Sequence, residues 1–182
     1  MDDTLIWSNE HRAWWRPHRC GYTVEIAEAG RYAMADAQKI AADALYGRRS
    51  GEPVPEIAIN FREIVERIED GSYTSSADMP AIMVLLGYEC IEHQRLGIAC
   101  RKFGESHWQS VPQLDANGAA LYLDPSLTGG HFHDIGLNDD GTWYVGFNHP
   151  QRGNDYANSK RMSLAMWGSF VCLMGMVERA DG

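Results

Sequence analysis

Three histidines and one aspartate are the side chains in this sequence best suited to metal chemistry. His131 and His133 are separated by one residue, so in a β-strand both imidazoles lie on the same face. Two imidazoles on one face suit a divalent metal, with His149 as a third ligand and Asp134 on the opposite face. The other interpretation is a surface hairpin that turns at Asp140-Gly141. The sequence favours the hairpin and keeps a metal-dependent enzyme as an alternative.

Other catalytic signatures are absent from the sequence. It contains no G-x-S-x-G nucleophile elbow, no Walker A loop and no H-E-x-x-H zinc motif. Its 4 cysteines are widely spaced, without a C-x-x-C pair, and we expect reduced thiols that pack as small buried hydrophobic groups. No cofactor is predicted, and a divalent metal belongs only to the histidine alternative. The sequence therefore favours binding over catalysis.

Tryptophan and arginine cluster near the N-terminus and form the strongest candidate for a binding surface. Both residue types are frequent at binding hot spots, and the same groups can stack on nucleic-acid bases. Alternation places two adjacent tryptophans on opposite faces of a strand, so at most one joins Trp7 in the core. The other covers a second layer as a packing residue of a small domain, which the sequence favours, or faces out and contacts a partner. The predicted partner-binding residues are Trp14, Trp15, Arg12, Arg16 and Arg19.

The same segment carries a recognisable motif, in which IWSNEHRAWWRPHRCGYT is followed by EAGRY. This opening resembles that of a group of small phage and prophage proteins over roughly residues 1–50. The resemblance implies a phage or prophage origin and a location in the cytoplasm of the bacterial host, and it implies no activity. In that group a serine follows Gly-Arg-Tyr and would cap a helix. Here Ala33 stands at that position, so the capping hydrogen bond must come from elsewhere or be absent.

Charge is distributed unevenly along the 182 residues. Residues 1–50 hold seven Lys/Arg and seven Asp/Glu, whereas residues 51–182 hold nine against eighteen and carry the whole net charge of −9. An acidic body repels phosphate, which disfavours direct nucleic-acid binding. The same body can instead occupy a basic site on a partner. The sequence therefore predicts an accessory protein, an acidic inhibitor or counter-defence factor, that engages a host protein or nucleoprotein complex.

Hydrophobic periodicity predicts an α+β fold in two parts. A small β-hairpin and helix module occupies residues 1–50, and a larger helical and antiparallel-sheet domain occupies residues 51–182. The polar, proline-bearing residues 48–55 are the expected linker between them. The predicted elements are strands at 4–8 and 13–16 and helices at 37–45, 61–70 and 78–86.

A further helix, predicted at residues 90–102, provides a second alternative function. Three consecutive helices followed by strands have the layout of a winged helix. In that arrangement Arg95, Arg101 and Lys102 would face DNA. A solvated helix face accounts for the same residues and agrees better with the acidic charge. A winged-helix DNA-binding protein therefore stays an alternative.

Residues 162–177 contain no formal charge and form the most apolar segment of the chain. A membrane span needs about 20 apolar residues, and this segment is shorter and contains Gly168 and Gly175. We expect a buried helix whose glycines allow close approach of other elements, and a homodimer seam if the helix is not fully covered. Because Asp2 and Asp3 follow Met1, no signal peptide is predicted, and no membrane association is expected.

Overall fold

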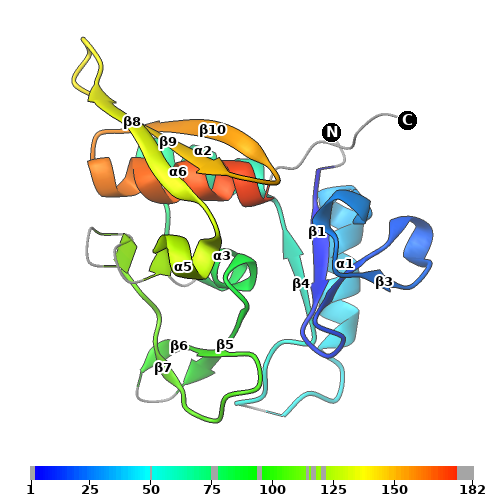
Figure 1. Ribbon diagram of the computed structural model, residues 1–182. Helices are drawn as coiled ribbons and strands as arrows, with labels where there is room; N and C mark the ends of the chain where they lie inside the picture. The colour runs from blue at the N-terminus through cyan, green and yellow to red at the C-terminus, as the bar shows by residue number, and fades with distance from the viewer. Residues whose placement is uncertain are drawn as a thin grey trace. The chain divides into compact units, whose positions relative to one another are not determined.

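The chain has an α+β fold with three antiparallel sheets in the part that the structure describes (Figure 1). A computed structural model describes residues 3–49, 51–74, 78–93, 96–113, 115, 118–119 and 122–175. Within these residues the chain forms two compact units, which are considered separately below. Unit 1 consists of Met1–Asn60 and Gly87–Ser110, and unit 2 consists of Phe61–Leu86 and Val111–Met176.

The first sheet of unit 1 confirms the two strands predicted at the start of the chain. Its strands have the order β3-β2-β1-β4. They are β1 (Leu5–Ser8), β2 (Ala13–Trp15), β3 (Tyr22–Thr23) and β4 (Glu56–Ile59). Trp7 pairs with Trp14, and Trp15 pairs with Tyr22, so the two adjacent tryptophans lie on opposite faces as alternation requires.

Helix α1 (Met34–Ala44) packs on one face of this sheet, where Ala37 and Ile40 join Ile6 in a buried cluster. Its N-cap residue is Ala33, and within the described residues no side chain caps the helix, which agrees with the expectation that Ala33 supplies no cap. The helix ends at Ala44, and Gly47 follows with a left-handed φ of 83°. The hydrophobic stripe that packs on the sheet therefore accounts for the helix without a contribution from its N-cap residue.

Strand β4 lies beyond the boundary expected at residue 50, yet it belongs to the sheet of unit 1. It pairs antiparallel with β1 along its whole length, from Leu5 opposite Ile59 to Ser8 opposite Glu56. The proline-bearing segment before β4 is held by Asn9, whose side chain donates to the carbonyl of Val54 at 2.6 Å. The Asn9 hydrogen bond makes this proline-bearing segment part of the packing of unit 1. Strand β4 belongs to the same unit because its backbone pairs with β1.

The prediction of a helix at residues 90–102 is wrong. Strands β5 (Tyr88–His93) and β6 (Gly97–Lys102) form a hairpin there, and β7 (Gln109–Ser110) extends it to a three-stranded sheet. Gly97 adopts a φ of 69° at the turn, which favours glycine. Pairing of Cys90 with Cys100 buries both side chains across the hairpin. Without this helix the winged-helix arrangement loses its recognition element.

Unit 2 contains a second three-stranded sheet, of order β10-β9-β8, covered on one face by helix α6 (Figure 1). The hairpin predicted around Asp140-Gly141 is confirmed, because β8 pairs with β9 on either side of it. Two predicted helices are confirmed as α2 and α3. The elements are α2 (Phe61–Asp70), α3 (Met79–Leu85), α5 (Pro125–Thr128), β8 (His131–Leu137), β9 (Trp143–His149), β10 (Gly153–Ser159) and α6 (Met162–Gly175).

Asp78, at the start of α3, anchors this helix to α2. Its carboxylate is 1% exposed, accepts hydrogen bonds from Arg67 at 2.6 Å and 3.0 Å, and accepts a third from the backbone N–H of Thr74 at 2.8 Å. Asp78 is the N-cap residue of α3, but its side chain makes no capping hydrogen bond to this helix. A paired buried carboxylate resists separation of the two helices, because breaking the pair would leave a charge without a partner.

Helix α6 is the buried helix that the uncharged C-terminal run predicts. Ten of its 14 residues are buried, and it packs on β9, β10, α2 and α3. Gly168 and Gly175 lie where a Cβ would come within 2.8 Å of Ala157 and 2.5 Å of Phe61, so both glycines allow close packing. With most of its surface covered, the helix offers little apolar area to a second copy. No helix among the described residues is long and apolar enough to cross a membrane.

The cysteines are all free thiols, and their burial agrees only in part with expectation. Cys90, Cys100 and Cys172 are buried, as small apolar side chains usually are. Cys20 is exposed, because it lies in the short connection between β2 and β3 rather than in a packed strand.

Candidate functional site

An exposed group of three rings lies on unit 1 and forms the best candidate for a contact surface. We call His11, Trp15 and Tyr22 the aromatic patch. The ring of His11 stacks on Tyr22 with centroids 3.9 Å apart, and Trp15 meets Tyr22 edge to face at 5.7 Å. Register places Trp15 opposite Tyr22 across β2 and β3, and the turn after β1 brings His11 over them. His11 and Tyr22 are exposed, and Trp15 is half-buried.

A buried carboxylate holds the aromatic patch in place. Glu56 on β4 is 7% exposed and accepts a hydrogen bond of 2.7 Å from the indole N–H of Trp15. Burial raises the pKa of Glu56, and the hydrogen bond from Trp15 acts in the opposite direction. Burial and the nearby carboxylates of Glu56 and Glu10 also raise the pKa of the Tyr22 hydroxyl. Trp15 is thus oriented by a specific acceptor as well as by packing.

Two of the predicted binding residues are engaged within the fold. Trp14 is 4% exposed and meets Trp7 edge to face at 4.9 Å, so it is a core residue and unavailable to a partner. Arg16 donates from Nε to the carbonyl of Tyr22 at 3.0 Å and pairs with Glu28 at 2.6 Å. Its guanidinium therefore fastens β3 to β2 at the border of the aromatic patch.

The other two predicted arginines are exposed and lie on different sides of the β1–β2–β3 strands. Arg12 follows His11 in the β1–β2 turn and lies over the ring of Phe103 at 5.3 Å. Arg19 lies at the end of the turn between β2 and β3, where it lines a pocket discussed below. The structure thus brings Trp15 together with His11 and Arg16. Arg12 lies with Phe103 on the side of Trp7 and Trp14 instead.

Two of the three basic residues of the DNA-binding alternative lie in the described part of the chain, and they do not share a surface. Arg101 and Lys102 are adjacent on strand β6, so their side chains point to opposite faces. Arg101 pairs with Glu89 at 2.6 Å and lies over the ring of Trp108 at 4.3 Å, which occupies its guanidinium. Arg95 lies outside the described residues. The sheet geometry therefore gives no support to a groove-reading helix.

His133 lies on one face of the sheet of unit 2, in a hydrogen-bonded cluster with Asp134 and Tyr156. We call these three residues the His133 cluster. His133 on β8 and Tyr156 on β10 both face Gly146 of the central strand β9. A Cβ at Gly146 would lie 2.8 Å from the Tyr156 ring and 2.9 Å from the His133 ring, so glycine permits both rings to cover this strand. Asp134 has a left-handed φ of 45° at a bulge, which turns its carboxylate toward the other two.

Hydrogen bonds set the protonation of the His133 cluster. One carboxylate oxygen of Asp134 lies 2.9 Å from Nδ1 of His133 and accepts a 2.8 Å hydrogen bond from the Tyr156 hydroxyl. These hydrogen bonds, first that of Tyr156 and then that of His133, lower the pKa of Asp134. The same contact with Asp134 raises the pKa of Tyr156. Nε2 of His133 is buried over Gly146 without a hydrogen-bond partner in the described structure, so it does not face a substrate.

The predicted metal ligands are not brought together. His131 and His133 share a face, with ring centroids 6.4 Å apart. His131 pairs with Asn148, so the next residue, His149, points to the opposite face. There its Nδ1 accepts the backbone N–H of Gln151 at 3.2 Å. No group of three or more His, Cys, Asp or Glu side chains suited to a metal occurs among the described residues.

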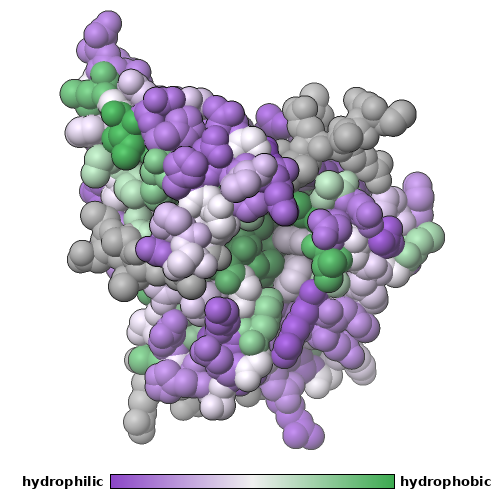
Figure 2. Space-filling view, viewed as in Figure 1, coloured by the Kyte–Doolittle hydropathy of each residue, from purple (hydrophilic) through white to green (hydrophobic). Residues whose placement is uncertain are grey.

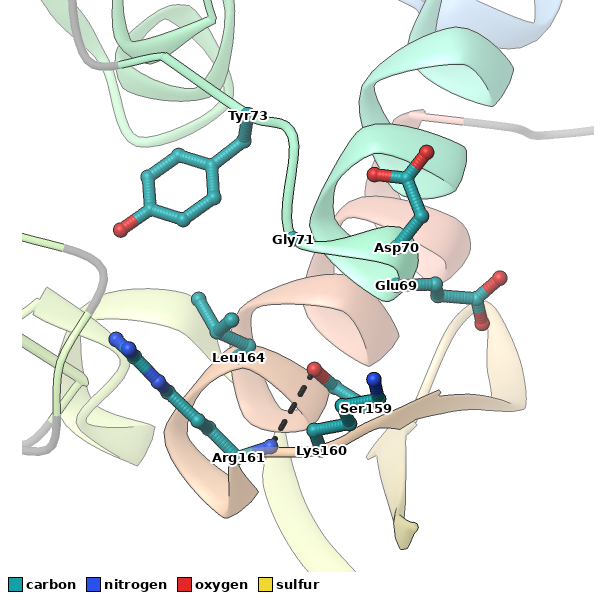
Figure 3. A pocket seen from close by; sticks show the side chains of 8 residues that line it. All are labelled: Glu69, Asp70, Gly71, Tyr73, Ser159, Lys160, Arg161 and Leu164. Atoms are coloured by element: carbon teal, nitrogen blue, oxygen red, sulfur yellow. Dashed lines mark hydrogen bonds between the residues drawn. The ribbon is translucent and has the colours of Figure 1, made fainter.

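A pocket of about 440 Å³ lies beside the N-terminus of α6 (Figure 3). In Figure 3 the side chains of Tyr73 and Arg161 extend to one side of Leu164, and the carboxylates of Glu69 and Asp70 lie on the other. Glu69 accepts the backbone N–H of Asn158 at 3.1 Å, and Asp70 that of Ser72 at 2.7 Å. The complete lining is Glu69, Asp70, Gly71, Tyr73, Ser159, Lys160, Arg161 and Leu164. Two cations and two carboxylates cancel, so this pocket has no net charge to select an ion.

Sequence reasoning missed Glu56 as the anchor of Trp15 and Tyr156 as the partner of Asp134. Each contact joins residues far apart in the sequence, 41 positions in the first case and 22 in the second. The signal that could have found Tyr156 is its pairing with Gly146, since an aromatic residue opposite a glycine on a neighbouring strand is a recurrent sheet arrangement. Glu56 carries no such signal, because its partner depends on the pairing of β4 with β1.

Comparison of the chain with protein-family models, with curated proteins and with solved structures gave no significant match.

Proposed function

We propose that this protein acts by binding another protein through the aromatic patch of unit 1. The observation that carries the proposal is the exposed stack of His11 on Tyr22, which also meets Trp15 and is bordered by Arg16. Preoriented aromatic rings lose little conformational entropy when a partner covers them. Aromatic residues and arginine are also the residue types that dominate binding hot spots.

The charge of the chain indicates the kind of partner. Residues 51–182 hold the entire net charge of −9, and exposed Asp139 and Asp140 lie at the tip of the β8–β9 hairpin. Figure 2 shows hydrophilic side chains at this projecting tip of unit 2. An acidic surface is attracted to a basic site on a partner and accelerates encounter with it. We therefore propose a partner with a basic surface.

The biological role that we propose follows from the opening motif. Its resemblance to small phage and prophage proteins supports a bacterial host protein or nucleoprotein complex as the partner, met in the host cytoplasm. By occupying a basic site, an acidic protein can inhibit the host protein or complex that uses that site. An inhibitor or counter-defence factor is therefore the function we favour, ahead of a metal-dependent enzyme.

A double substitution in the aromatic patch, compared with a control substitution of an exposed tyrosine elsewhere on unit 1, tests this proposal. Tyr22→Ala combined with His11→Ala removes the exposed stack, whereas Tyr46→Ala removes a tyrosine that is 97% exposed on the same unit. Trp15 is left intact because it packs against the cluster of Ile6, Ala37 and Ile40, and its loss would remove packing as well as an exposed ring. We expect the double variant to lose at least about tenfold in affinity for the captured host partner, as loss of a hot spot of about 1.4 kcal/mol or more implies.

The readout is capture of host protein by tagged full-length chain, followed by titration of the identified partner. Tyr46→Ala should bind that partner like the wild type. Equal affinity of the double variant and the wild type for the same partner contradicts the proposal, and so does equal weakening by Tyr46→Ala.

A further inference from the structure

A pocket of about 570 Å³ lies beside the connection between β2 and β3 of unit 1. We call it the β2–β3 pocket. Its lining consists of Pro17, His18, Arg19, Arg31, Tyr32 and Asp36. The first three residues form a 3-10 turn after β2, and Asp36 lies in the first turn of α1. The hydroxyl of Tyr32 donates to the carbonyl of Arg16, which ties the wall of the pocket to the end of β2.

The charges of the β2–β3 pocket differ from those of the rest of the molecule. Arg19 and Arg31 bring two permanent positive charges, and His18 adds a third when protonated. Asp36 is the single carboxylate among the six lining residues. The pocket is thus positive in a protein of net charge −9. A concave positive site in an acidic protein is suited to an anion of limited size.

The backbone around the β2–β3 pocket is held in an unfavourable conformation. His18 and Arg19 have φ values of 56° and 59°, a left-handed conformation that is unfavourable for residues other than glycine. This turn directs two side chains with nitrogen donors to the lining of one pocket. The first turn of the 11-residue helix α1 lies in the same wall, and within the described chain Ala33 offers it no capping side chain. The helix dipole adds positive potential on this side.

We propose that the β2–β3 pocket binds the phosphate group of a small phosphorylated molecule. Guanidinium groups match phosphate oxygens in shape and charge, and the two arginines outnumber the single carboxylate of Asp36. A nucleic-acid strand is a poorer ligand, because its many phosphates are repelled by a protein of net charge −9. This binding is separate from the proposed protein contact and does not depend on it.

Inorganic phosphate titrated into the full-length protein tests the proposal, with amide chemical shifts as the readout and sodium chloride at matched ionic strength as the reference. We expect saturable shifts at His18, Arg19 and Arg31 and at the start of α1. Arg19→Gln should weaken phosphate binding at least fivefold. The control Arg49→Gln removes the same charge from an exposed position of unit 1 outside the pocket, and should change the affinity less than twofold.

Three results would overturn the assignment. One is the absence of saturable shifts in the wild-type protein, which needs no variant to interpret. Another is equal weakening by Arg19→Gln and Arg49→Gln, which indicates general screening rather than a site. The third is tighter binding of a 15-nucleotide single strand than of phosphate at the same residues, which would assign the pocket to nucleic acid.

Discussion

Gly168→Ala tests the packing of α6 against β10, on which the sheet of unit 2 depends. A Cβ at position 168 would lie 2.8 Å from the Cβ of Ala157 and 3.5 Å from Cγ2 of Ile68. Carbon atoms prefer separations of about 3.5–4.0 Å, so α6 and β10 must move apart by several tenths of an ångström. The Cβ of Ala157 is attached directly to the backbone and cannot rotate away. The substitution therefore forces the strand or the helix to shift.

The expected magnitude is a balance of two opposite effects. Overpacking a core by one methyl group costs about 1–3 kcal/mol, whereas replacing glycine by alanine inside a helix gains about 1 kcal/mol. We expect Gly168→Ala to lower the free energy of unfolding by about 1 kcal/mol. At a helix position without this contact, the same substitution would raise it by about 1 kcal/mol.

The assay is urea unfolding followed by far-UV circular dichroism, with a double-mutant cycle that includes Ala157→Gly. Removing the methyl group of Ala157 takes away the atom that the new Cβ would meet. The double variant should therefore be more stable than the sum of the single effects predicts, by about 1–2 kcal/mol. A stabilising effect of Gly168→Ala alone, or additive effects in the cycle, would refute the close contact between α6 and β10.

Two further predictions concern the titration of side chains. Hydrogen bonds to Asp134 lower its pKa from 3.8, so they stabilise the fold above that pH and are lost as the pH falls through the lower folded pKa. Tyr156→Phe should raise the pKa of Asp134 and move this loss to higher pH, as a carboxyl NMR titration would report; an unchanged pKa would contradict the hydrogen bond. Burial raises the pKa of Cys172 to about 12 and raises that of Cys90, whereas Cys20 is exposed. Alkylation of native protein near neutral pH should therefore modify Cys20 alone, and equally rapid labelling of Cys172 would show that unit 2 is open.

Local patterns were sufficient to predict most of the regular elements. The apolar stripe of α2 and the left-handed Gly71 after it are properties of a short segment, and helix geometry depends mainly on such segments. The β8–β9 hairpin follows from a strong turn signal between alternating residues. Strand alternation also predicted that Trp14 and Trp15 separate, with at most one of them joining Trp7.

The hairpin of β5 and β6 shows where local patterns fail. The apolar residues between Cys90 and Lys102 fit a short helix stripe as well as a pair of strands. Pairing decides between them, because Cys90 opposite Cys100 and Ile91 opposite Ala99 bury their side chains only when the chain turns back at Gly97. Periodicity over so short a run does not separate a buried helix from a buried strand.

The candidate sites are harder to predict from the sequence than the helices and strands, because the sites depend more on contacts between distant residues. Composition alone identified tryptophan and arginine as binding residues, but it could not assign Trp14 to the core or Arg16 to an ion pair with Glu28. The β2–β3 pocket joins a turn after β2 to the first turn of α1, and a sequence pattern does not report that proximity.

The sequence by itself determined the α+β class, the helix without a cap at Ala33, the β8–β9 hairpin and the buried helix α6. These features depend on hydrophobic periodicity, turn residues and capping, which act over a few neighbouring positions. Only the tertiary structure decided that β4 joins β1, that Glu56 holds Trp15, and that Asp134 meets Tyr156. Such contacts join distant residues, and their free energy appears only when the packed elements bring the side chains together.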